Sequence, residues 1–285
     1  MLKAKYIKAY RILPSLKIRG DLGHEDLGWD EIGYLALSEP VDINAVRTIA
    51  SHGHKFHDQA FRSADFQNLL EKFEFQELLS IMDDIDATDN WGRTLLHYLV
   101  INNDKESLMS IKKLITMGSN VNTIDHYGLT PLLQIIALRS PFEEPSIRSL
   151  KVSRLLLDSG ANPDYFSNNC CILAAQQTNN GTALHVAAAH IKLTEFTRLL
   201  LDKGADVNIR NRFGETPLHE AVQNFNEAAI PLLLAAGADI NAEDDKGKTP
   251  LMKLDESNYS EYKYLGPAIR EKLIAAGAVM TTPQQ

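Results

Sequence analysis

The sequence predicts an all-α fold, a solenoid of about five repeats preceded by an N-terminal helical cap. Two observations lead to this fold class. Two short motifs recur in phase along the last two-thirds of the chain. Their spacing also settles at a fixed period, because the steps from Gly181 to Gly214 and from Gly214 to Gly247 are both 33 residues. Such a period is typical of stacked helical repeats, each of which buries its apolar face only against its neighbours.

The composition is that of an ordinary globular protein, and it excludes several function classes. Of the 285 residues, 44% are hydrophobic and 23% are charged, which is enough apolar material for a buried core. The formal net charge of -8 argues against a nucleic-acid partner, because neutralising phosphates requires clustered Lys and Arg. No apolar run approaches the ~20 residues that cross a bilayer, so we expect no integral membrane association.

The first motif has the consensus Gly-x-Thr-Pro-Leu-His. Its copies begin at Gly92, Gly128, Gly181, Gly214 and Gly247. We expect the threonine of each copy to cap a helix, since its hydroxyl accepts from backbone N–H groups that have no partner within the helix. Where proline follows, it occupies the first helical position, at which its missing N–H does no harm. Each copy therefore marks the start of a first helix.

The second motif is a run of leucines followed by Gly-Ala-Asp-Val-Asn or a relative. Its copies begin at Gly118, Gly160, Gly204, Gly237 and, in truncated form, Gly277. We expect the leucines to lie on a second helix that packs between repeats. The glycine then ends that helix in a left-handed conformation. The residues after it form the turn into the next repeat.

Because both motifs recur in phase, residues from about 89 to 279 resemble the ankyrin-repeat family. The resemblance implies a protein that is not an enzyme and needs no cofactor. It implies binding of a partner protein through the turns at the repeat junctions and through the exposed face of the first helices. It also implies that the motif histidines His97, His185 and His219 hydrogen-bond between neighbouring repeats and do not catalyse a reaction.

The resemblance also assigns candidate partner-binding residues, position by position. They are Trp91, Arg93, Tyr98, His126, Tyr127, Gln134, Arg212, Phe213, Glu215, Glu220 and Lys246. We expect Trp91, Tyr127, Arg212 and Phe213 to contribute most, because exposed aromatic and Arg side chains dominate interface energies. The alternative is that these side chains pack against the neighbouring turn, an alternative that applies most to Trp91.

A modification is implied by the same resemblance. Ankyrin repeats are substrates of asparagine hydroxylation at the asparagine that ends the second motif. Three residues match that position, namely Asn122, Asn208 and Asn241, and each has a leucine eight residues before it. These asparagines are therefore modification candidates.

The chain divides into four segments by these patterns. Residues 1–60 do not match the repeat, residues 61–88 read as a degenerate capping repeat with a helix near residues 73–82, residues 89–280 are the repeats, and residues 281–285 are a tail. The first twenty residues carry six basic residues and no acid. Two interpretations of them stay open: a basic helix that touches an anionic membrane or acidic partner, or a helix packed on the first repeat.

Three insertions interrupt the repeats. They cover residues 139–150, 164–180 and 255–266. Insertions in a solenoid lengthen loops, often on the binding side, so these segments either decorate the surface or contribute to binding.

Other candidate chemistry is weakly supported. Residues 52–58 hold three histidines and an aspartate, but their spacing matches no zinc motif, so we expect a polar loop and no metal. Cys170 and Cys171 are adjacent, a poor geometry for a structural disulfide, and they match no cysteine-hydrolase signature. With no other cysteine, the chain indicates a reducing compartment. We assign no catalytic residue.

Two function classes remain after these exclusions. The first is a monomeric interaction module in the cytoplasm that binds a protein. The second is an effector of an intracellular bacterium, delivered to the host cytosol, with an additional activity in residues 1–60. The irregular, heavily inserted repeats are similar to those of such effectors.

Overall fold

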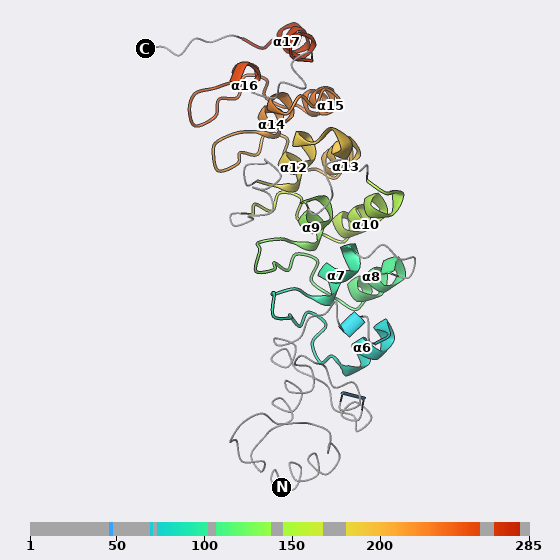
Figure 1. Ribbon diagram of the computed structural model, residues 1–285. Helices are drawn as coiled ribbons and strands as arrows, with labels where there is room; N and C mark the ends of the chain where they lie inside the picture. Colours follow the sequence, from blue (N-terminus) through green and yellow to red (C-terminus); the bar gives the residue numbers. More distant parts are fainter. Residues whose placement is uncertain are drawn as a thin grey trace. The chain divides into compact units, whose positions relative to one another are not determined.

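The computed structural model describes residues 46–47, 69–70, 73–101, 107–137, 145–167, 181–256 and 265–279 (Figure 1). The chain forms two compact units, Met1–His126 and Tyr127–Gln285, and each is described by itself. Several predictions lie outside the described residues: the basic N-terminal run, the histidines of residues 52–58, both cysteines and most of the three insertions. The four segment boundaries also stay predictions.

The described part of the first unit contains helical residues at 46–47 and 69–70, then a further helix and a helix pair. Helix α6 (Phe75–Ile81) lies where the sequence predicts the helix of the capping repeat. Helices α7 (Leu95–Ile101) and α8 (Ser107–Thr116) then pack against each other and make the first repeat. Leu95 and Leu96 of α7 and Ile111 and Leu114 of α8 have no exposed surface, so the core of this repeat lies between its two helices.

The second unit holds four further helix pairs. The second repeat has α9 (Pro131–Ala137) and α10 (Ile147–Asp158), and the third has α12 (Ala183–Ala189), the 3-10 turn η1 (Ile191–Leu193) and α13 (Thr194–Asp202). The fourth has α14 (Pro217–Gln223) and α15 (Ala229–Ala235), and the fifth has α16 (Pro250–Glu256) and α17 (Gly266–Ala275). Among the described elements every one is helical, which confirms the predicted fold class.

The helices of the second unit form two layers. The first helices α9, α12, α14 and α16 contact one another in sequence order, and the second helices α10, α13 and α15 do the same (Figure 1). The inner layer is built from small side chains such as Ala187, Ala188 and Ala221, which let neighbouring helices approach closely. The outer layer repeats one buried leucine in each helix. These residues are Leu156, Leu200, Leu233 and Leu273.

The second motif ends its helix as expected. Gly204 follows α13 with φ +83, a left-handed conformation that strains any residue with a Cβ. Its N–H donates to the Leu201 carbonyl at 3.0 Å, and the N–H of Ala205 donates to the Leu200 carbonyl at 3.0 Å. This pair of bonds satisfies two carbonyls that a helix end leaves without partners. The stop is followed at once by the turn into the next repeat.

The caps of the first helices differ between repeats. In the second repeat the Thr130 hydroxyl accepts from the N–H of Leu133 at 3.2 Å, as the sequence predicts. In the third and fourth repeats the hydroxyls of Thr182 and Thr216 instead lie within 3.0 Å of a histidine Nδ1. The histidine of the motif is therefore part of the cap. Of the described helices, none is long and apolar enough to span a membrane.

Candidate partner-binding site

An Asp or Asn opens the turn that precedes most first helices. In the fourth hairpin (residues 209–216) Asn211 Oδ1 accepts from the N–H groups of Phe213 at 2.9 Å and Glu215 at 3.0 Å. In the fifth hairpin (residues 242–249) Asp244 Oδ1 accepts in the same way from Lys246 at 2.8 Å and Lys248 at 2.9 Å. A side chain that holds two backbone amides fixes the loop conformation. The turns are therefore rigid platforms for the residues at their tips.

The same arrangement occurs in the first unit. In the first hairpin (residues 89–94) Asp89 Oδ1 accepts from the N–H groups of Trp91 at 2.8 Å and Arg93 at 2.9 Å. This Asp or Asn is not part of the motif that predicted the repeats, although it stands three residues before the motif glycine in four of the five copies. The signal was present and could have identified the turn.

Of the four side chains that were expected to contribute most to binding, three are exposed at the turn tips. Trp91 is 42% exposed and Phe213 is 38% exposed. Arg212, His126 and Lys246 are also exposed, whereas Tyr127 is half-buried. The Arg212 guanidinium stacks on the Phe213 ring at 4.5 Å. The tips thus present aromatic and cationic surface to solvent in both units.

The prediction of an exposed face on the first helices is wrong at the positions that it named. Tyr98, Gln134 and Glu220 are all buried. The Tyr98 hydroxyl donates to Asp89 Oδ2 at 2.6 Å, so the hairpin of its own repeat covers this side chain. Glu215, predicted at a turn tip, is buried as well, at 2% exposure. Arg93 is half-buried, and its Nε donates to Asp125 Oδ2 at 3.2 Å. These side chains hold the hairpins in place.

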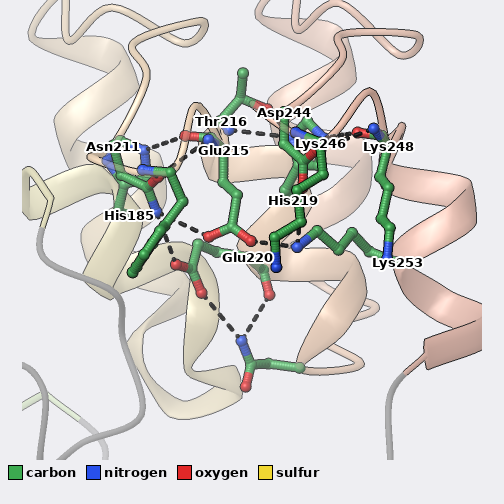
Figure 2. Close-up of polar contacts among 12 residues, drawn as sticks. His185, Asn211, Glu215, Thr216, His219, Glu220, Asp244, Lys246, Lys248 and Lys253 are labelled. Carbon is green, nitrogen blue, oxygen red and sulfur yellow. Dashed lines mark hydrogen bonds and ion pairs between the residues drawn. The ribbon is translucent and has the colours of Figure 1, made fainter.

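A cluster of buried polar side chains joins the fourth and fifth repeats, as Figure 2 shows. We call it the polar cluster. Its members are Asn211, Glu215, Glu220, Asn224, Asp244 and Lys253. At its centre Lys253 Nζ lies 2.5 Å from Glu215 Oε1 and 3.0 Å from Asp244 Oδ2. Asn211 Nδ2 donates to Glu215 Oε2 at 3.0 Å and to Glu220 Oε1 at 3.4 Å.

The surroundings of Lys253 and Asp244 favour the charged forms of these two side chains. Burial by itself would lower the pKa of Lys253, but the hydrogen bonds that Lys253 donates to Glu215 and Asp244 outweigh burial and raise that pKa above its ordinary value. Burial opposes ionisation of Asp244 too, yet its hydrogen bonds with Lys248, Lys253 and Lys246 lower its pKa. One cation shared by two carboxylates thus links the two hairpins to α16. Loss of one partner would leave the other charges buried without compensation, so this ion pair stabilises the contact between the two repeats.

Two of the three motif histidines, His185 and His219, bridge neighbouring repeats as the resemblance implies, and His97 contacts Thr94 of its own repeat. Nε2 of His185 lies 3.0 Å from the Glu215 carbonyl, and Nε2 of His219 lies 2.9 Å from the Lys248 carbonyl, so each contacts the next repeat. Nδ1 of each ring accepts from the N–H of Thr182 or Thr216. Because Nδ1 accepts, the proton sits on Nε2. Burial lowers the pKa of His185 to about 4, which keeps the ring neutral.

Two of the modification candidates form a pair of hydrogen bonds with the following repeat, which we call an asparagine clasp. Asn208 Nδ2 donates to the Gly237 carbonyl at 3.1 Å, and Asn208 Oδ1 accepts from the Asp239 N–H at 2.7 Å. Asn241 makes the same two bonds with Gly277 at 3.2 Å and Val279 at 2.9 Å. Both amide atoms of each side chain are therefore engaged. No group of three His, Cys, Asp or Glu side chains in the described ranges is arranged to hold a metal ion.

Comparison with known families identifies the repeats in part of the chain. Residues 152–244 and 184–265 match the family model described as ankyrin repeats (3 copies). This part of the chain therefore consists of ankyrin repeats, and the helix pairs of the first and second repeats have the same form.

Individual relatives are found in viruses and in mammals. An ankyrin repeat protein of Variola virus is 32% identical over 139 residues, which is 47% of this chain and 22% of the viral protein. NF-kappa-B inhibitor zeta of Homo sapiens is 30% identical over 196 residues, covering 50% of this chain and 27% of the human protein. B-cell lymphoma 3 protein of Homo sapiens is 32% identical over 143 residues, covering 50% and 27%.

The chain thus spans about a quarter of the length of these curated relatives. The comparisons named here are with viral and human proteins, so the expected likeness to effectors of intracellular bacteria gains no support from them.

Proposed function

We propose that the chain is a non-catalytic module that binds a partner protein on its hairpin tips. The observation that carries the proposal is the pairing of rigid turns with exposed recognition side chains: Trp91 in one unit and the stacked Arg212–Phe213 pair in the other. Side chains of these types dominate interface energies when they are held in place before binding. Ankyrin repeats are typically interaction modules, which agrees with this reading.

Tyr98, Gln134, Glu215 and Glu220 are buried, so the proposed partner-binding surface does not include them. Buried side chains make no contact with a partner, so the proposal now rests on the tip residues. These are Trp91, His126, Tyr127, Arg212, Phe213 and Lys246. In this proposal the module is a monomer and works in the cytoplasm.

The test compares partner capture by variants that differ only at the surface. We expect Trp91→Ala and the double variant Arg212→Ala/Phe213→Ala each to lose at least tenfold in retained partner, since hot-spot truncations cost about 2 kcal/mol or more. The matched control is Lys151→Ala/Arg154→Ala, which removes two exposed cations from α10. Far-ultraviolet circular dichroism verifies that each variant is folded. Equal capture by all of them would refute binding at the tips.

We propose that Asn122, Asn208 and Asn241 are modification candidates in the same module. Asn208 is exposed and Asn241 is half-buried, so both side chains are accessible to a hydroxylase, although their amide groups are hydrogen-bonded to the next repeat. Incubation with an asparaginyl hydroxylase followed by intact-mass measurement should then show one added oxygen per accessible asparagine. An unchanged mass, also in mild denaturant, would exclude the modification.

The alternative of an effector with a second activity in residues 1–60 stays a prediction. Removal of residues 1–60 tests it, because loss of an activity with partner capture intact would show that the chain is more than a binding module.

A further inference from the structure

The fourth and fifth hairpins together hold four basic and four acidic residues, but two of the acids are buried, so the charge that reaches their surface is positive on a chain whose formal net charge is -8. Four cations of these hairpins reach the surface, namely Arg210, Arg212, Lys246 and Lys248. The exposed carboxylates are Glu243 and Asp245. The remaining acids of the two hairpins, Glu215 and Asp244, are buried against Lys253. The hairpin tips are thus electropositive relative to the rest of the chain.

The geometry brings these cations into one place. The N–H of Asp245 donates to the Phe213 carbonyl at 3.0 Å, so the tips of the two hairpins lie against each other. Arg210 uses part of its charge on Asp245, with Nη2 at 3.5 Å from Oδ1. In contrast, neither Arg212 nor Lys246 forms an ion pair within the described part of the chain. Two uncompensated cations therefore stand on neighbouring rigid turns.

Arg212 is also prepared for recognition. Its guanidinium carbon lies over the Phe213 ring, 4.5 Å from the ring centroid, and this cation–π contact restricts the exposed side chain. A guanidinium edge binds a carboxylate with two parallel hydrogen bonds, a geometry that a lysine cannot reproduce. Lys246 adds a point charge that suits a second carboxylate.

We infer that the fourth and fifth hairpins recognise a carboxylate-rich segment of the partner protein, with Arg212 on one carboxylate and Lys246 on another. The inference rests on the proposed function and specifies the chemistry of the partner. A nucleic acid fits the same charges less well. It presents a continuous row of phosphates and needs a row of cations, whereas this patch has two uncompensated ones and the chain as a whole is acidic.

The probe for the test is a fluorescent oligoglutamate peptide, with oligolysine and a single-stranded RNA oligonucleotide as comparison probes. We expect the full chain to bind oligoglutamate with an affinity that falls as salt rises. Arg212→Ala/Lys246→Ala should weaken binding about tenfold, and Arg212→Lys should weaken it about threefold because the fork geometry is lost while the charge remains. The control Lys151→Ala/Arg154→Ala removes the same charge from α10 and should leave the affinity unchanged.

Three results would overturn the inference: equal loss in the tip and control variants, tighter binding of RNA than of oligoglutamate, or equal binding of oligolysine. Its failure can be told apart from failure of the proposed function. If oligoglutamate does not bind but Arg212→Ala/Phe213→Ala still loses a captured protein, the tips bind a partner of other chemistry. If the tip variants change neither oligoglutamate binding nor partner capture, both proposals are wrong.

Discussion

The polar and aromatic side chains in and around the turns are of two kinds. Some are buried and stabilise the turns, and others are exposed to solvent at the turn tips. Lys253 belongs to the first kind, with a side chain that is 11% exposed and two carboxylates in contact. Arg212 and Phe213 belong to the second kind. Both kinds include charged or aromatic residues, so the residue type does not tell which side chains stabilise the turns. The exposure of the side chain does.

Removing the Lys253 charge should destabilise the fold strongly. The substitution Lys253→Met leaves Glu215 and Asp244 buried without a cation. We expect a loss of about 3 kcal/mol in the free energy of unfolding, measured with urea, because an uncompensated buried charge is far more costly than an absent pair. Lys246→Met, which removes an exposed cation from the same hairpin, should change stability by less than about 0.5 kcal/mol. An unchanged urea midpoint of unfolding for Lys253→Met would show that Lys253 does not stabilise the polar cluster.

The buried histidines should make the fold sensitive to acid. The folded-state pKa of His185 is lowered to about 4 from 6.5, so the unfolded chain binds the proton more tightly. The resulting stability is present above pH 6.5 and is lost as the pH falls toward 4, and for His185 the loss between pH 7 and pH 5 is about 2 kcal/mol. Burial also lowers the pKa of His219, which adds a loss of the same sign.

The measurement is urea unfolding at pH 7 and pH 5 for the natural chain and for His185→Gln. The variant should be less stable at pH 7 and should lose less between the two pH values. If the variant and the natural chain lose equally, His185 does not contribute to the pH dependence.

At the scale of the helices, one position in the outer layer departs from the repeat pattern. Outer helices place Ile111, Ser153, Thr197 and Ile230 at equivalent positions, three residues before the buried leucine of each. The hydroxyls of Ser153 and Thr197 are buried, and among the described residues neither has a hydrogen-bond partner. A buried hydroxyl without a partner destabilises the fold, so this pair is a defect in an otherwise apolar layer.

Thr197→Val should therefore stabilise the protein, by about 1 kcal/mol, because it replaces the hydroxyl with a methyl group of similar size. Thr216→Val is the matched control, since that hydroxyl lies 2.9 Å from His219 Nδ1 and its loss should destabilise by about 1 kcal/mol. Thermal unfolding of both variants gives the comparison. A lower melting temperature for Thr197→Val would mean that its hydroxyl is satisfied in solution.

The helices could be predicted from the sequence, but which side chains of the first helices and hairpins are buried could not. The caps and helix stops depend on residues within one repeat, so Thr130 and Gly204 were identified by the local motif. Glu220 is buried beside Asn211, nine positions earlier, and Glu215 is buried beside Lys253 of the next repeat, so neither burial follows from the local motif. The Lys253–Glu215 contact joins residues 38 positions apart, and no periodicity encodes it.

At the scale of the whole molecule, the repeats hold together through contacts between neighbours. Within the second unit, the histidine bridges, the asparagine clasps and the polar cluster all connect one repeat to the next. Stability in such an array is close to a sum of terms for each repeat and for each interface. The side chains of Arg212, Phe213 and Lys246 take no part in the bridges, clasps or polar cluster, which leaves them available to a partner without loss of the fold.

The central claim is that a partner contacts the hairpin tips, and site-directed photo-crosslinking tests it most directly. A photoreactive phenylalanine analogue placed at Phe213 keeps the size of the exposed ring, and the same analogue placed at Lys151 on α10 provides the comparison. The account predicts a crosslinked complex from the position of Phe213 and none from the position of Lys151. A complex formed only through the position of Lys151 would place the partner on the outer helices and contradict the account.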